Sequence, residues 1–149
     1  MLNITLCDDN AIQRGYIKSL VLDWSNRSGV GIITSEFPSA DALLFSYDEL
    51  KPDILLLDEP TNYLDIRYQI EILKLVKKLN QEYGITIVMV LHDINQAITY
   101  SDRIIGLKDG QVLVEGAPED VITEESIREL YGINLGVTSI DGRKFVLAV

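Results

Sequence analysis

The chain has 149 residues, of which 47% are hydrophobic, and a formal net charge of -10. This length and composition indicate a folded chain with a substantial core and exclude a disordered one. The acidic balance argues against a nucleic-acid partner or an anionic membrane surface, because both bind basic patches.

The sequence also carries signals about its compartment. Cys7 is the single cysteine, so no internal disulfide forms, and reducing surroundings suit it. No basic segment followed by an apolar run opens the chain, and no stretch is long and apolar enough to cross a bilayer. We therefore expect a cytoplasmic protein with neither a nucleic-acid nor a membrane partner.

The first third of the chain predicts strands that alternate with helices. Apolar strands and helical segments are expected in turn at residues 2–7, 11–27, 31–37, 40–48 and 53–57. The first helix has an apolar stripe, because large apolar side chains recur near every fourth position at Ile12, Tyr16, Leu20 and Trp24, with Ile17 and Val21 beside them. This alternation is typical of a parallel sheet with right-handed crossovers.

The strand over residues 53–57 organises the rest of the prediction. Its unbroken Ile-Leu-Leu-Leu run lacks the alternation of a half-exposed strand, so helices are expected on both of its faces. The strand delivers Asp58 to its carboxyl end. Open parallel sheets bind ligands at that end, so Asp58 is a candidate site residue.

The remainder predicts more strands and helices, with antiparallel hairpins toward the C-terminus. Segments are expected at residues 66–82, 85–91, 94–100, 103–107, 111–115, 124–131, 133–139 and 144–149. Asp109-Gly110 and Asp141-Gly142 are hairpin turn signals. The composition does not shift along the chain, which favours a single domain over residues 1–149.

Residues 1 to about 58 resemble the receiver domain of a bacterial response regulator, of the type that carries LytTR-like output domains. The resemblance rests on three segments, Met1–Asn10, Phe37–Leu44 and Asp53–Asp58. It implies a flavodoxin-like sheet, a Mg²⁺ ion held with the help of Asp8 and Asp9, and a phosphoryl group accepted by Asp58. Three converging carboxylates repel one another, and a hard divalent cation relieves that repulsion. The alternative is that these acids only cap the first helix and the next loop.

Residues from about 55 to 149 resemble the C-terminal part of an ABC transporter ATPase of the iron-siderophore or haem importer type. The matching segments are Leu55–Asp65, Val90–Asn95, Ser101–Gly110 and Gly116–Val121. The resemblance implies that Asp58 contacts Mg²⁺, that Glu59 polarises the attacking water, and that His92 contacts the γ-phosphate.

Both patterns are incomplete. The sequence contains neither the Gly-x-x-x-x-Gly-Lys-Ser/Thr loop that cradles phosphates nor the Leu-Ser-Gly-Gly-Gln signature. A receiver has a hydroxyl at the end of its fourth strand, where this chain has Leu91 and His92. Lys108 falls near the lysine that a receiver has after its fifth strand, although an exposed turn lysine is the alternative reading of that position.

These observations predict an engineered fold chimera without evolved activity, which is not an enzyme and requires no cofactor, Mg²⁺ being the one candidate. The expected fold is an α/β three-layer sandwich of the flavodoxin-like or Rossmann-like kind, with strand order 2-1-3-4-5 and added C-terminal hairpins. Two alternatives stay open: a receiver-like phosphoacceptor that binds Mg²⁺, and a residual ATP-binding protein of the ABC type. Apolar surface left by missing neighbours would favour a homodimer.

Overall fold

The computed structural model describes the backbone of residues 1–148 and their side chains, apart from those at positions 44, 47 and 48. The chain divides into two compact units, Met1–Leu91 and His92–Val149. The sequence predicted one domain with an internal boundary near residue 58. Residue 58 lies inside the first unit, and the single domain stays a prediction.

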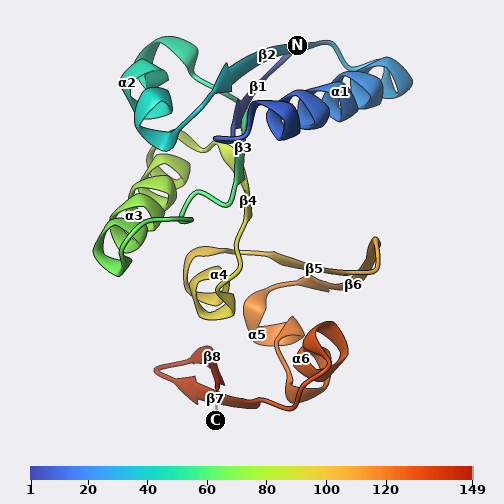
Figure 1. Cartoon of the computed structure of the whole chain (residues 1–149), viewed down its shortest axis with the longest axis vertical. Coiled ribbons are helices and arrows are strands. Elements are labelled where there is room, and N and C mark those ends of the chain that lie inside the picture. The colour runs from blue at the N-terminus through green and yellow to red at the C-terminus, as the bar shows by residue number, and fades with distance from the viewer. Residues whose placement is uncertain (149) are drawn as a thin grey trace. The chain divides into compact units, whose positions relative to one another are not determined.

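The first unit is built on four parallel strands in the order β2-β1-β3-β4 (Figure 1). Its elements are β1 (Leu2–Cys7), α1 (Ala11–Ser28), β2 (Ile32–Phe37), α2 (Ala40–Leu50), β3 (Ile54–Asp58), α3 (Ile66–Tyr83) and β4 (Thr86–Val90). Strand β1 lies between β2 and β3, with Cys7 opposite both Phe37 and Leu57. The carboxyl ends of β1 and β3 are therefore side by side.

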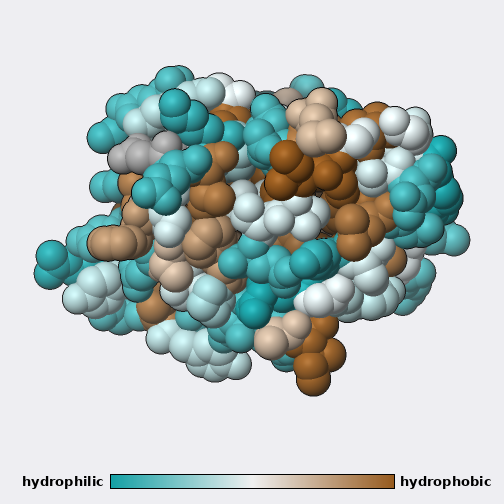
Figure 2. All heavy atoms as spheres, turned by 90° about the horizontal axis from the view of Figure 1, so that it is seen from above, coloured by the Kyte–Doolittle hydropathy of each residue, from teal (hydrophilic) through white to brown (hydrophobic). Residues whose placement is uncertain are grey.

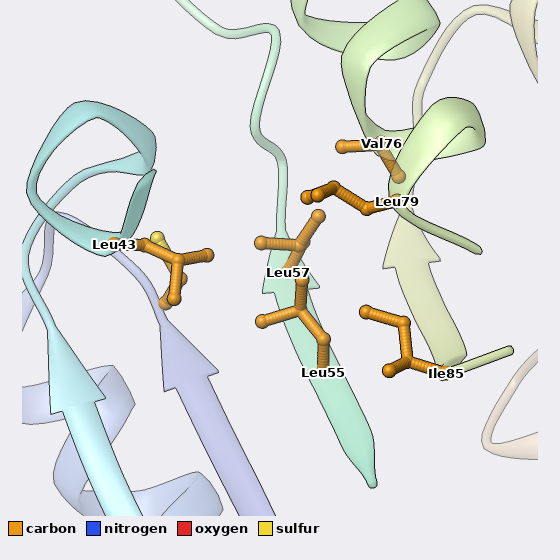
Figure 3. Close-up of a cluster of buried hydrophobic side chains, with 7 residues drawn as sticks. Leu43, Leu55, Leu57, Val76, Leu79 and Ile85 are labelled. Carbon is orange, nitrogen blue, oxygen red and sulfur yellow. The ribbon is translucent and has the colours of Figure 1, made fainter. Parts of the chain in front are cut away.

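One face of this sheet carries the core of the first unit. Figure 3 shows Leu55 and Leu57 of β3 between Leu43 of α2 and the α3 residues Val76 and Leu79. Leu55 is fully buried, with 0% of its surface exposed. Helices α2 and α3 therefore cover this face as the sequence predicted.

The other face is covered less completely, which corrects the prediction for α1. Within the described chain none of the residues of α1 is buried. Four residues of the expected apolar stripe are exposed, by 87% at Ile12, 63% at Tyr16, 48% at Leu20 and 43% at Trp24, whereas Ile17 and Val21 are half-buried. Figure 2 shows hydrophobic residues, in brown, among hydrophilic ones at the molecular surface.

Ion pairs explain how α1 is turned. Arg14 and Lys18 both bind Glu36 of β2, with 3.6 Å between Arg14 Nε and Glu36 Oε2. These bonds hold the Arg14–Lys18 face of the helix toward the sheet and leave the larger apolar stripe outside. In β3 burial alternates, since only Leu55 and Leu57 are buried. The prediction that both faces of β3 are covered was therefore wrong.

The second unit contains two separate antiparallel hairpins, β5–β6 and β7–β8. Its elements are α4 (Ile94–Tyr100), β5 (Ile104–Lys108), β6 (Gln111–Gly116), α5 (Pro118–Val121), α6 (Glu124–Tyr131), β7 (Gly136–Ile140) and β8 (Arg143–Leu147). The predicted hairpins are confirmed. In the described sheets β5 pairs with β6 and does not join β4, so the predicted order 2-1-3-4-5 was wrong at its fifth strand. Asp109 and Gly110 both have positive φ, the geometry that favours this local pairing.

The core of the second unit is a small apolar cluster beside a polar clamp. Its buried residues are Ile98, Ile104, Ile122, Ile127 and Val146. The Asn95 side chain donates from Nδ2 to the Val146 carbonyl at 3.0 Å and accepts from the Val146 N–H at 2.9 Å. One asparagine of α4 thereby satisfies both backbone groups of a β8 residue, as a neighbouring strand would.

Candidate functional site

The candidate site lies at the carboxyl ends of β1 and β3, where two acids follow adjacent strands. Asp8 comes directly after β1, and Asp58 is the last residue of β3. The parallel register sets Cys7 opposite Leu57, one residue before each acid. The sheet itself therefore brings Asp8 and Asp58 together, as the sequence predicted for residues that follow neighbouring parallel strands.

Asp8 is held by the loop that starts α1. Its Oδ1 accepts from the Asn10 N–H at 2.8 Å, and Asn10 in turn caps α1 by accepting from the N–H groups of Ile12 and Gln13. The helix cap is therefore Asn10, and Asp8 orients it. Asp8 is only 6% exposed, and its Oδ2 has no hydrogen-bond partner among the described residues. A buried carboxylate oxygen without a partner is costly and fits a cation.

Asp58 is held from the side of α1. The Gln13 Nε2 group donates a hydrogen bond to Asp58 Oδ2. Burial raises the pKa of Asp58 above its ordinary value, the negative charges of Asp8 and Glu59 raise it further, and the Gln13 hydrogen bond opposes them. The two carboxylates therefore lie close enough to repel each other.

Glu59 begins a tight turn immediately after β3. Its φ of 47° lies in the left-handed region, which costs free energy in a residue with a side chain. Its N–H donates to the Val90 carbonyl at 3.1 Å, and its carbonyl accepts from the Asn62 N–H at 3.0 Å. The Asn62 side-chain amide also donates to the Glu59 carboxylate. Strand β4 and this turn thus fix Glu59 at the end of β3.

These residues line a cleft of about 560 Å³. Its lining includes five acids and two aromatic side chains: Asp8, Asp9, Asp41, Asp58, Glu59, Tyr63 and Tyr68. No lysine or arginine is among the described residues that line it. Carboxylates gathered in a concave, partly dry site concentrate a negative potential, so the cleft favours cations.

The predicted trio of metal ligands is only partly assembled. In the described part of the chain, no three His, Cys, Asp or Glu side chains form a group that could hold a metal ion. Asp8 and Asp58 lie together, whereas Asp9 is exposed. A pair of carboxylates still fits Mg²⁺, which commonly binds one or two carboxylates and keeps several waters.

The two remaining predicted site residues belong to the second unit. His92 is exposed and opens that unit. Lys108 ends β5, is exposed, and donates from Nζ to the Glu129 carbonyl. This contact agrees with the alternative of a turn lysine that serves its own unit. The roles of His92 and Lys108 beside Asp58 stay predictions.

Sequence reasoning missed Gln13 and Asn62, the two amides that bind the acids. A signal for Gln13 was present, because it stands three residues after the capping Asn10 and so faces the loop that carries Asp8. Asn62 gave no such signal, since its contact depends on the left-handed conformation of Glu59.

Comparison with known proteins finds relatives that resemble the C-terminal part of the chain. The chain is 51% identical over 87 residues to the petrobactin import ATP-binding protein FpuC of Bacillus anthracis, which covers 58% of this chain and 32% of that protein. The C-terminal part resembles the ATPase of a siderophore importer. The chain is also 37% identical over 131 residues to the probable siderophore transport system ATP-binding protein YusV of Bacillus subtilis (strain 168), 88% of this chain and 47% of that protein.

The fold has a counterpart among solved structures. A metal-chelate type ABC transporter in an inward-facing conformation aligns with a TM-score of 0.60 over 70% of this chain and 42% of that one, at 23% identity. That similarity shows the fold, a mixed α/β arrangement with a parallel sheet. No family model matches the chain. The chain spans between 32% and 47% of the two relatives described above.

These relatives correct two predictions. The prediction of an engineered chimera without evolved activity was wrong, because the chain resembles natural ATP-binding proteins at up to 51% identity. The YusV match covers 88% of the chain and so runs past the seam expected near residue 58. The prediction that the chain is not an enzyme was wrong for the same reason, since its relatives are ATP-binding proteins of import systems. A receiver in residues 1–58 finds no support in them.

Of the helices in the described chain, none combines the length and the apolar character needed to cross a bilayer.

Proposed function

We propose that the chain supplies the acidic, water-activating part of an ATP-binding protein of the ABC importer type, acting in siderophore uptake at the cytoplasmic side. The observation that carries this proposal is the Leu55–Asp65 segment. It forms the end of β3 and the following turn, and it sets Asp58 and Glu59 in the cleft. In this proposal Asp58 holds Mg²⁺, Glu59 orients the attacking water, and His92 contacts the γ-phosphate.

The charges of the cleft define what this chain contributes. ATP carries several negative charges, and the cleft offers five acids and none of the described basic residues. Direct approach of the polyphosphate is therefore unfavourable. Bound Mg²⁺ would neutralise phosphate oxygens there. The 149-residue sequence has no phosphate-cradling glycine loop, so the chain supplies only the acidic side of such a site.

The experiment is a titration with a fluorescent ATP analogue, with Mg²⁺ and with EDTA in its place. We expect weak, saturable binding that requires Mg²⁺ and is lost in Asp58→Asn. The matched control is Asp53→Asn, just before the same strand, where the carboxylate accepts from the Asn3 N–H at 2.7 Å. Binding that is absent with Mg²⁺, or equal in wild type and Asp58→Asn, would refute the proposal.

A second candidate function rests on a different observation. Asp8 and Asp58 follow adjacent strands of a sheet ordered β2-β1-β3-β4, and Asp8 keeps a buried oxygen without a described partner. This arrangement supports a receiver-like role in which Asp58 accepts a phosphoryl group, Asp8 and Asp9 help to hold Mg²⁺, and Lys108 contacts the phosphate. Amide NMR signals near Asp8, Asp9 and Asp58 should then shift with Mg²⁺ and beryllium fluoride together, and unmoved signals would remove this candidate.

The exposed face of α1 supports a homodimer. Its large apolar side chains, Tyr16 and Trp24 among them, are exposed by 63% and 43%. Burying such a stripe against a second copy would remove it from water. Sedimentation velocity should show a dimer that Tyr16→Ser with Trp24→Ser converts to a monomer, and a wild-type monomer at high concentration would contradict this assignment.

A further inference from the structure

We propose that Gln13 is a positioning residue for the Asp8–Asp58 pair, and that its neutral amide makes the cleft selective for a small divalent cation of the Mg²⁺ class over Ca²⁺. This inference rests on the proposed function, because it concerns the cation site of the same cleft.

Gln13 is tied to both acids through the start of α1. The Asp8 carboxylate accepts from the Asn10 N–H at 2.8 Å, and the Asn10 side chain accepts from the Gln13 N–H at 3.1 Å. The backbone of Gln13 is thus fixed relative to Asp8. Its side-chain amide reaches across to donate to Asp58 Oδ2. Gln13 therefore links the two carboxylates that the sheet register brings together.

The hydrogen bonds also decide which oxygens remain for a cation. Asn10 occupies Asp8 Oδ1, and Gln13 occupies Asp58 Oδ2. Asp8 Oδ2 is buried and has no hydrogen-bond partner in the described structure, although it belongs to a residue that is only 6% exposed. This buried oxygen without a donor fits a cation ligand, because a buried carboxylate oxygen otherwise finds a donor.

The number of carboxylates at the pair sets its selectivity. An amide that donates through Nε2 adds no negative charge, so the pair offers a cation two carboxylates. Mg²⁺ binds well to one or two carboxylates and keeps its waters, whereas Ca²⁺ takes six to eight oxygen ligands and gains from each added carboxylate. A glutamine at position 13 therefore favours Mg²⁺, and a glutamate there would favour Ca²⁺.

The opposing interpretation is that Gln13 is an ordinary exposed side chain in the first turn of α1. Under that interpretation its replacement would change neither cation affinity nor cation selectivity. Three variants of the full chain separate the two interpretations. Gln13→Leu removes the donor, Gln13→Glu replaces it with a third carboxylate, and Gln69→Leu is the matched control. The Gln69 Nε2 group donates to the Leu64 carbonyl at 2.9 Å, a backbone acceptor outside the acid pair.

The experiment titrates each variant with Mg²⁺ and with Ca²⁺ while amide NMR signals of the first unit are followed. Loss of a residue that orients a metal ligand costs about 10-fold or more in affinity, and this is expected for Mg²⁺ with Gln13→Leu. Gln69→Leu should match wild type. Gln13→Glu should raise the affinity for Ca²⁺ relative to Mg²⁺ by on the order of 10-fold.

The outcomes separate this inference from the function on which it rests. Equal Mg²⁺ affinity in wild type and Gln13→Leu, or an unchanged Ca²⁺-to-Mg²⁺ ratio in Gln13→Glu, overturns the role of Gln13 and leaves the cation site standing. A wild type that binds neither ion overturns both. Should Gln13→Leu lose its dispersed amide spectrum, the selectivity of Gln13→Glu, which keeps the shape of the side chain, decides the question.

Discussion

The same substitution, leucine to alanine, should have very different effects at two positions of the first unit. Leu55 of β3 is 0% exposed and packs in the cluster of Figure 3, whereas Leu20 of α1 is 48% exposed. Leucine to alanine removes about three methyl or methylene groups, and at a fully buried site their loss costs about 2.4 kcal/mol in transfer free energy alone. The cavity left behind raises the cost of Leu55→Ala to about 3–4 kcal/mol. At Leu20 the loss is less than about 1 kcal/mol, because alanine is the better helix former.

Urea unfolding of the full chain, followed by the fluorescence of Trp24, measures both variants in the first unit. With a slope of about 1.5 kcal/mol per molar urea, Leu55→Ala should lower the midpoint by about 2 M. Leu20→Ala should move it by less than about 0.7 M. Equal destabilisation by the two variants would show that the outer stripe of α1 is packed, and the described orientation of the helix would then be incorrect.

Three further predictions concern the site and the second unit. Because burial and Asp8 raise the pKa of Asp58, the folded state binds the proton more tightly than the unfolded chain, and stability falls as pH rises through the raised pKa. Asp58→Asn should therefore be more stable than wild type at neutral pH, and the two should be equally stable in acid below the ordinary pKa range of Asp. A constant difference between the urea midpoints of the two proteins across this pH range would contradict the prediction. Asn95→Ala should destabilise the second unit by about 1–2 kcal/mol and speed hydrogen exchange at the Val146 amide, since both clamping bonds are lost; unchanged exchange would show that the clamp carries no stability. Gly106→Ala should cost about 1–3 kcal/mol, because its Cβ would lie 2.7 Å from Val114 Cγ2. Its control, Gly15→Ala in open space on α1, should be neutral or stabilising by thermal unfolding.

The sequence predicted those features that depend on neighbouring residues. The strands, the helices and the Asp109-Gly110 hairpin follow from patterns within a few residues of each other. The meeting of Asp8 and Asp58 was also predictable, because parallel pairing of β1 and β3 forces the ends of the two strands together. These features need only local propensity and the rule that parallel strands end at one edge.

Features that depend on distant partners were not predictable. Helix α1 has two candidate faces, and a sequence pattern favours the one with the larger side chains. The deciding contacts join Arg14 and Lys18 to Glu36, which belongs to another strand. The fifth strand was misplaced for a similar reason, since its pairing with β6 is local and the expected pairing with β4 was not. The position of Gln13 after the capping Asn10 was visible in the sequence, but its hydrogen bond to Asp58, 45 residues away, was not.

Both candidate functions require a cation at Asp58, and the charges around that residue set the order in which they can be tested. An ATP site and a phosphoacceptor site each need a cation at Asp58 before any phosphate can approach five carboxylates. They differ in what must follow. A phosphoryl group that bonds to Asp58 needs little more than compensation of its charge, whereas a free polyphosphate also needs basic residues, which the described cleft lining does not provide. The cation titration therefore comes first, and the nucleotide titration is meaningful only for a chain that has passed it.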